Sequence, residues 1–221
     1  VPRILSLVER FVVPPFSVFD ALAGYWQDRK AAWIAMGIQS ELGRVIDATT
    51  DARYRFDLEG RENQRQARPT AYNMAKDANA TGVLDDQGRS TGVSIFDPVL
   101  SECVYRWYCP RGGTVLDPFA GGSVRGIVAG VLGRQYVGIE LTAPQVAANM
   151  AQRTAMADWM APPPAWAVGD SREVLPMWTA LGADLMFTCP PYFDLEVYSD
   201  DPRDLSAMTS YGDFLDAYGA I

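Results

Sequence analysis

Apolar and polar positions alternate along the second half of the chain in the manner of interleaved strands and helices. Short apolar runs predict strands at 114–117, 136–140, 166–168 and 184–188, and helical spacing predicts helices at 99–108, at 123–132 and from Thr142, a candidate N-cap, onward. Strands that alternate with helices are typical of a parallel, doubly wound sheet. We therefore predict an α/β fold with four candidate strands.

The first 92 residues follow a different pattern. Apolar residues recur at roughly helical spacing from Asp20 to about Ile46, which predicts a helix-rich stretch with Trp26 and Trp33 in the core. Residues 50–92 are polar, with scattered Gly, Asn and Arg, and indicate loop or poorly ordered chain. We divide the chain into an N-terminal helical and irregular extension, 1–92, and an α/β domain, 93–221.

The first strand leads into a glycine turn, and a helical stretch follows the turn. The sequence of 115–122 is VLDPFAGG, and the glycines would let the backbone approach a ligand where a Cβ would clash. Strand, glycine turn and helix form the opening unit of a nucleotide-binding sheet. The dinucleotide fingerprint G-x-G-x-x-G and the P-loop are both absent, which argues against nicotinamide and ATP.

Each predicted strand ends at or just before residues that suit a ligand. Asp117 and Glu140 are the last residues of the first two strands, Asp170 comes just after the third, and the Cys-Pro-Pro-Tyr turn, 189–192, follows the fourth. The carboxyl ends of parallel strands share one edge of a sheet, so we expect these groups to converge there. Glu140 is placed to accept hydrogen bonds from ribose hydroxyls. Asp170 bonds an adenine amino group or caps a helix, and Asp117 orients the glycine turn or contacts the cofactor's amino group.

Composition narrows the chemistry. The chain has 221 residues, 48% of them hydrophobic, and no apolar run approaches the length of a membrane span, so we expect no membrane association. The first residues lack a secretory core. Three cysteines without metal-type spacing and the absence of histidine argue for a reducing, cytoplasmic setting and against a metal site. The absence of histidine also excludes Ser-His and Cys-His nucleophile pairs.

The net charge of −8 argues against nucleic acid as a partner, but the charge is unevenly distributed. Residues 1–68 carry ten Lys and Arg against nine Asp and Glu, whereas residues 69–221 carry nine against eighteen. The stretch 53–68 has five arginines and three acids. It is either a solvated face or an arm that contacts a nucleic-acid backbone.

In combination these motifs resemble the S-adenosylmethionine-dependent DNA amino-methyltransferases, which make N6-methyladenine or N4-methylcytosine. The resemblance covers about residues 93–200 and rests on DPFAGG, GIEL, GD, CPPY and the upstream SIFDP. It is closest to phage and bacterial modification methylases in which the cofactor half precedes the catalytic half. It implies a Rossmann-like methyltransferase sheet, the cofactor S-adenosylmethionine, and double-stranded DNA as the partner.

The resemblance also implies roles for individual residues. The methionine end of the cofactor would be held by Ser94, Phe96 and Asp97, and the loop beneath it would be formed by Phe119, Ala120, Gly121 and Gly122. Glu140 would bind the ribose, and Asp170 would bind the adenine amino group. The catalytic turn would be formed by Cys189, Pro190, Pro191 and Tyr192. No metal is implied. The family usually has Asp, Asn or Ser where this chain has Cys189. Since a thiol is a weak hydrogen-bond partner, the choice between cytosine and adenine stays open.

The chemistry of the turn supports the same reaction. An exocyclic base nitrogen is a poor nucleophile because its lone pair is delocalised into the ring, so it needs an acceptor for its N–H and alignment with the methyl donor. Pro190 and Pro191 give a stiff backbone whose carbonyls can accept from that amine, and Tyr192 can stack on the base. A base within a duplex must first flip out. An alternative, in which Cys189 accepts the methyl group as a nucleophile, is disfavoured by the tyrosine after Pro-Pro.

Three further expectations remain open at this stage. A sheet of this type has seven strands, so the chain is expected to be incomplete beyond the catalytic turn. Residues 1–92 would serve in DNA contact or in a homodimer. The rival functions are a methyltransferase acting on RNA or on a protein amide nitrogen, and a non-catalytic cofactor- or DNA-binding regulator with the same fold.

Overall fold

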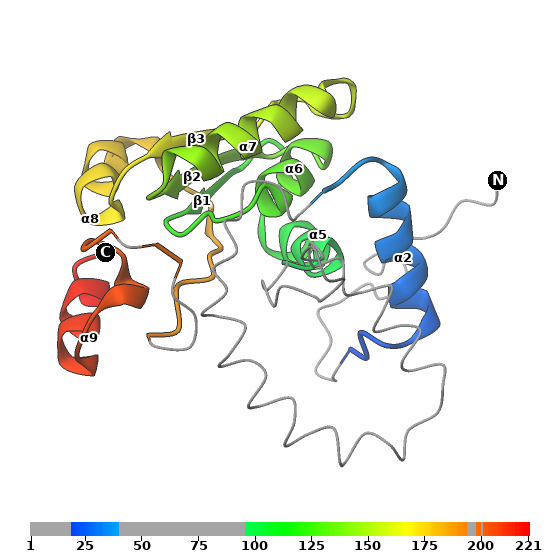
Figure 1. Ribbon diagram of the computed structural model, residues 1–221. Coiled ribbons are helices and arrows are strands. Elements are labelled where there is room, and N and C mark those ends of the chain that lie inside the picture. The colour runs from blue at the N-terminus through cyan, green and yellow to red at the C-terminus, as the bar shows by residue number, and fades with distance from the viewer. Residues whose placement is uncertain (1–18, 40–95, 194–197, 200) are drawn as a thin grey trace, which may run out of the picture. The chain divides into compact units, whose positions relative to one another are not determined.

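The computed structural model describes residues 19–39, 96–193, 198–199 and 201–221 (Figure 1). Ser94 of the predicted cofactor site and the arginine-rich stretch 53–68 therefore lie outside the described residues.

Four parallel strands form the sheet, in the order β3-β2-β1-β4. The strands are β1 (Thr114–Asp117), β2 (Gln135–Glu140), β3 (Ala165–Val168) and β4 (Leu185–Met186). Val115 of β1 is in register with Tyr136 of β2 on one side and with Leu185 of β4 on the other. The predicted α/β class and all four strands are confirmed, and the architecture is compatible with a Rossmann-like fold.

Six α-helices occur among the described residues: α2 (Gly24–Ala35), α5 (Pro98–Tyr108), α6 (Val124–Val131), α7 (Ala143–Ala155), α8 (Ser171–Val174) and α9 (Tyr211–Gly219). Three 3-10 helices, η1 (Ala157–Trp159), η2 (Leu175–Leu181) and η3 (Leu205–Ala207), complete the described elements. Figure 1 shows α7 lying against the sheet, where it contacts β2 and β3, while α6 packs on α5 and β2. None of the described helices is long and apolar enough to cross a membrane.

Close approach of α6 to the sheet requires glycine at two facing positions. A Cβ on Gly138 of β2 would lie 2.8 Å from Ala120 Cβ and 2.9 Å from Trp166 Cδ1. A Cβ on Gly126 of α6 would collide with the same indole of Trp166. These two glycines therefore let α6 and the loop after β1 pack tightly over β2.

The main hydrophobic core includes residues from α2 as well as from the sheet domain. Trp26 and Trp33 of α2 are buried, as predicted, in the same cluster as Val99 and Cys103 of α5 and Val115 of β1. The N-terminal helix thus shares its core with the α/β domain, because its two tryptophans bury their apolar surface against α5.

A buried carboxylate reinforces this contact between α2 and α5. Glu102 of α5 has no exposed surface, and its carboxylate accepts from Arg29 Nε and Nη2 at 2.6 and 3.0 Å, from Trp33 Nε1 at 2.8 Å, and from Arg106 Nε at 3.0 Å. A buried charge is tolerated only when it is paired and hydrogen-bonded in this way. Removing Arg29, the arginine on α2, would therefore weaken the attachment of α2 to α5.

A second, smaller cluster forms around α9. Phe214 and Ala217 of α9 pack with Leu205 of η3, and Phe119 and Phe193 lie against them. Ser210 caps α9 by accepting from the N–H of Asp213 at 3.1 Å. This cluster brings the C-terminal helix to the two loops that contain the predicted site residues.

Candidate functional site

The strand order puts the predicted glycine loop beside the predicted catalytic turn. The loop, 118–122, follows β1, and the turn, 189–192, follows β4, which is the strand paired with β1. The order β3-β2-β1-β4 reverses direction between β1 and β4, and open parallel sheets bind ligands outside the strand ends at such a switch point. The convergence predicted from the strand ends is therefore present at this edge.

Thr188 joins the loop to the turn. Its hydroxyl donates to Asp117 Oδ1 at 2.6 Å and accepts from the N–H of Phe119 at 3.1 Å. The residue immediately before Cys189 is thus fixed to the start of the glycine loop. The alignment of the two segments follows from this side chain as well as from the pairing of the strands.

Asp117 lies at the centre of a buried network beneath the loop. It has no exposed surface, and it accepts from Arg125 Nε at 2.6 Å, from the Tyr136 hydroxyl at 2.7 Å and from the N–H of Phe119 at 3.2 Å, in addition to Thr188. Burial, and then the charge of Asp117, raises the pKa of Tyr136 well above its ordinary value, so its phenol stays a donor. This geometry favours the orienting role of Asp117 that the sequence left open.

Arg125 extends the network to the loop backbone. Its Nη2 donates to the carbonyls of Phe119 and Ala120 at 2.6 and 3.0 Å, and its guanidinium lies 4.4 Å from the centre of the Phe96 ring. Burial alone would lower the pKa of Arg125, but the charge of Asp117 raises it. Arg125 therefore holds the loop and brings Phe96 to it, a role that sequence analysis missed.

Gly121 and Glu140 meet at the next position of the loop. Gly121 has a φ of +50°, which favours glycine, and its N–H donates to Glu140 Oε2 at 3.0 Å. Glu140 Oε1 accepts from the N–H and the hydroxyl of Thr142 at 2.9 and 2.8 Å. Burial raises the pKa of Glu140 above its ordinary value, and these donors oppose that rise.

The starts of α7 and α8 are capped differently. Thr142 stands at the N-cap position of α7, but its side chain makes no capping hydrogen bond, because the hydroxyl donates to Glu140 instead. Asp170 does cap a helix, since its carboxylate accepts from the N–H of Arg172 at 2.9 Å. Hydrogen bonds and an ion pair with the Arg172 guanidinium lower the pKa of Asp170.

Asp97 lies at the start of α5, whereas the other predicted cofactor ligands among the described residues, apart from Phe96, lie at the ends of the strands or in the glycine loop. It caps α5 by accepting from the N–H of Val99 at 2.8 Å, and its second oxygen accepts from Trp26 Nε1 at 3.1 Å and lies 3.5 Å from Lys30 Nζ. Asp97 therefore connects α2 to the start of α5, directly beside Phe96. No sequence pattern links residues so far apart along the chain.

The predicted catalytic turn, 189–192, is more exposed than the loop, 118–122. Cys189 is partly exposed, its Sγ lies 3.5 Å from the Tyr192 hydroxyl, and Tyr192 itself is 58% exposed. Pro190 and Pro191 between them are partly buried. The turn therefore offers an accessible phenol ring and the stiff Pro-Pro backbone beside the loop.

Comparison of the chain with protein-family models and with curated proteins gives no match.

Proposed function

We propose that this chain is an S-adenosylmethionine-dependent methyltransferase that acts on the exocyclic amino nitrogen of a flipped-out DNA base, N4 of cytosine or N6 of adenine. One observation carries the proposal, namely that the glycine loop after β1 and the Cys-Pro-Pro-Tyr turn after β4 lie side by side and are joined through Thr188. A cofactor loop next to an amine-binding turn suits transfer between two bound groups.

The residues on the loop side fit the cofactor. The carboxylate of Glu140 has about four acceptor sites, and three are taken by Gly121 and Thr142, so one site on Oε2 and the Thr142 hydroxyl are available to the ribose. Gly121 and Gly122 present backbone without side chains. Phe96, held over Arg125, supplies an aromatic wall. When bound, S-adenosylmethionine supplies an electrophilic methyl group on its sulfonium.

The residues on the turn side fit the acceptor amine. A backbone carbonyl within the Pro-Pro turn accepts a hydrogen bond from the amine N–H, which orients the nitrogen lone pair toward the methyl group. Tyr192, whose ring is exposed, stacks on the base. Cys189 adds only a weak polar contact. The chain's part in the reaction is thus binding and orientation, without a covalent intermediate on the protein.

The proposal is tested by transfer of labelled methyl groups to unmodified DNA, with the product nucleosides identified after digestion. We expect N4-methylcytosine or N6-methyladenine. Tyr192→Ala should lower the rate by roughly 5- to 150-fold because it removes one base-stacking contact. Tyr108→Ala is the matched control, since Tyr108 is equally exposed, at 56%, but lies at the end of α5. Cofactor binding without transfer to any substrate would favour the regulator instead.

The pairing of the arginines favours a second candidate, transfer to a protein amide nitrogen. Residues 96–221 contain seven arginines, no lysine and fifteen acids. Four of the arginines pair with carboxylates: Arg106, Arg125, Arg172 and Arg203. Arg134 is buried and donates to three backbone carbonyls. Binding a DNA backbone requires cations that can approach phosphates. Label recovered in protein rather than in nucleosides would support this candidate.

A further inference from the structure

Phe193, the residue directly after the catalytic turn, has an unusual backbone conformation. Its φ is +44°, in the left-handed region that favours glycine. For a residue with a side chain this conformation costs about 1–2 kcal/mol. Such strain persists only where surrounding contacts hold the residue in place. Contacts of the Phe193 ring therefore hold the residue in this conformation.

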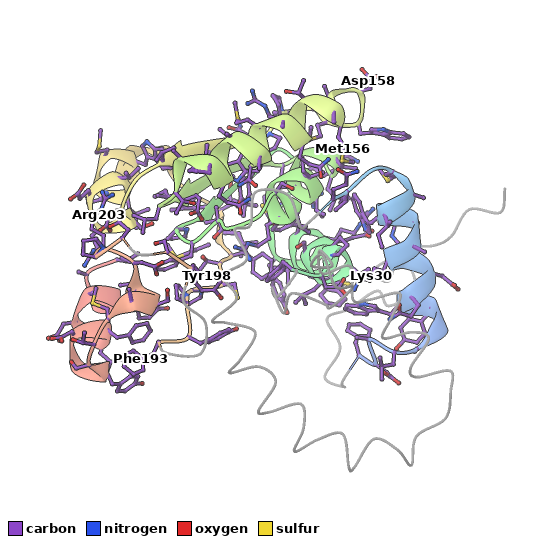
Figure 2. The ribbon with its side chains drawn as sticks, in the orientation of Figure 1. Lys30, Met156, Asp158, Phe193, Tyr198 and Arg203 are labelled. Carbon is purple, nitrogen blue, oxygen red and sulfur yellow. The ribbon has the colours of Figure 1, made fainter. Side chains whose placement is uncertain are left out.

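Those contacts come from α9. The ring of Phe193 lies 5.7 Å from that of Phe214 and 5.5 Å from that of Tyr211, at interplanar angles of 56° and 70° (Figure 2). Aromatic pairs at such separations and angles contribute about 0.5–1.5 kcal/mol beyond the area they bury. Two such pairs are comparable to the cost of the backbone conformation, so α9 can hold Phe193 as observed.

The same helix also reaches the glycine loop. Tyr218 of α9 stacks on Phe214 with ring centres 6.1 Å apart, and it stacks on Phe119 of the loop at 6.0 Å. Phe119, Tyr218, Phe214 and Phe193 thus form a continuous aromatic bridge from the loop to the end of the turn. Phe214, the most buried of α9's aromatic residues at 9% exposure, lies in the middle of it.

The turn is consequently held at both ends. At its start, Thr188 is hydrogen-bonded to Asp117 and Phe119, and at its end Phe193 is held by α9. The strand that precedes it, β4, has two residues, and its register with β1 ends at Met186, before the turn begins. Pro190 and Pro191 stiffen the chain between the two anchors.

We propose that α9, through the aromatic bridge, positions the catalytic turn relative to the glycine loop, and that Phe193 and Phe214 are positioning residues for the acceptor amine. The role of Phe193 and Phe214 in positioning the acceptor amine rests on the proposed function. The anchoring of the turn by α9 does not depend on that function. Simple packing of α9 would affect the stability of the fold and leave the turn's local opening unchanged. Anchoring of the turn predicts a change at residues 189–192 in the folded protein.

The thiol of Cys189 reports on the turn directly. The chain has three cysteines, and Cys103 and Cys109 are only 1% and 3% exposed, whereas Cys189 is partly exposed. The rate at which an aromatic disulfide reagent modifies the native protein therefore measures access to Cys189. Cys189→Ser should abolish the fast modification and so identify its source. The assay needs neither cofactor nor methyl acceptor.

The deciding variant is Phe214→Leu, which removes the central ring without altering the turn. We expect Cys189 to be modified about two- to tenfold faster, the range that corresponds to one aromatic pair. Tyr211→Leu, at an exposed position, should give a smaller change in the same direction and covers the case in which Phe214→Leu does not fold. Leu215→Ala, on the same helix and 46% exposed, is the matched control and should react as the wild type does.

Phe193→Tyr should retain the wild-type rate, because it keeps the ring. Equal modification rates in the wild type, Phe214→Leu and Tyr211→Leu would overturn the inference, whatever their melting temperatures. A second measurement separates this outcome from failure of the proposed function. If the chain transfers methyl groups, Phe214→Leu should lower kcat about two- to tenfold with the Kd for S-adenosylmethionine unchanged. If it transfers none, the thiol rates still decide whether α9 anchors the turn.

Discussion

The glycine loop, 118–122, and the Cys-Pro-Pro-Tyr turn, 189–192, are held in place by different kinds of interaction. On the loop side, Asp117 is fully buried, and Arg125, Tyr136 and Thr188 all donate to its carboxylate. On the turn side, Tyr192 is exposed and the neighbouring Phe193 is strained and packed on aromatic rings of α9. The loop is fixed by buried polar bonds, whereas the turn is fixed by the hydrogen bonds of Thr188 at its start and by apolar contacts from α9 at its end.

This difference matches the tasks proposed for the two segments. A cofactor loop benefits from being formed before the ligand arrives, because ordering a loop on binding costs free energy. A pocket for the methyl acceptor must admit a group as large as a base, so the segments that form its walls need to move when the acceptor enters. The buried network should therefore dominate stability, and α9 should govern access to the turn.

The largest expected effect comes from breaking the buried network at Arg125. Arg125→Met leaves the Asp117 carboxylate buried without its charge partner, and we expect the free energy of unfolding to fall by about 3–5 kcal/mol. Urea denaturation followed by circular dichroism measures this change. Arg203→Met, which removes an exposed ion pair with Asp201, should leave the unfolding midpoint nearly unchanged. Equal losses in both variants would contradict a special role for the network.

Filling the space under the loop should have the next largest effect. Gly138→Ala places a methyl group 2.8 Å from both Ala120 Cβ and Tyr136 Cε1, and overpacking of this kind costs about 1–3 kcal/mol. Thermal unfolding of the variant measures the loss. Gly219→Ala in α9, where no atom lies within 4 Å of the new methyl, should be neutral or stabilising. A neutral Gly138→Ala would mean that α6 and the loop can shift away from β2.

The link between the two segments can be weakened at Thr188. Thr188→Val keeps the shape of the side chain but removes the hydroxyl shared by Asp117 and Phe119, and we expect a loss of about 1–2 kcal/mol for the two hydrogen bonds removed. Hydrogen exchange should show faster exchange at the amide of Phe119. Thr154→Val, which removes an exposed hydroxyl on α7, is the control. An unchanged Phe119 amide would show that the strands alone align the segments.

The smallest expected effect is a pH dependence due to Glu140. Burial raises its pKa in the folded state, so the folded protein binds this proton more tightly than the unfolded chain does. The Glu140 contribution to stability therefore declines as the pH rises from about 4, its unfolded pKa, through the folded pKa, and is constant above it. Urea titrations across this range should show a flatter profile for Glu140→Gln. Identical stability profiles for the wild type and Glu140→Gln would show that other titratable groups cause the pH dependence.

The sheet and the edge at which the groups meet were predictable because their causes are local. The alternation of apolar runs with stretches of helical spacing predicts the four strands. The glycine turn after the first strand predicts the loop, and the position of Glu140 at the end of the second strand predicts that it lies near this loop. Strand four was predicted over 184–188, whereas β4 spans Leu185–Met186, although the N–H groups of Asp184 and Phe187 also donate to carbonyls of β1. The other predicted boundaries in the α/β domain differ by at most one residue at the ends of helices and strands, where local preferences are weakest.

The polar networks could not be predicted from the sequence. Arg125 was one residue in an apolar helix, and its partners become apparent only when the helix places it under the loop. Glu102 binds Arg29 and Trp33, about seventy residues earlier in the chain. The conformation of Phe193 depends on α9, which no local pattern connects to the turn. All three depend on tertiary contacts.

The most direct test of the account is calorimetric titration of S-adenosylmethionine into the wild-type protein, Glu140→Ala and Asp213→Ala. Glu140 lies beside Gly121 in the loop, and Asp213 lies on α9 with its carboxylate paired to Ser210. We predict saturable binding to the wild type, the same affinity in Asp213→Ala, and loss of binding in Glu140→Ala. Absence of binding to the wild type, or equal affinity in all three proteins, would contradict the claim that this edge of the sheet holds the cofactor.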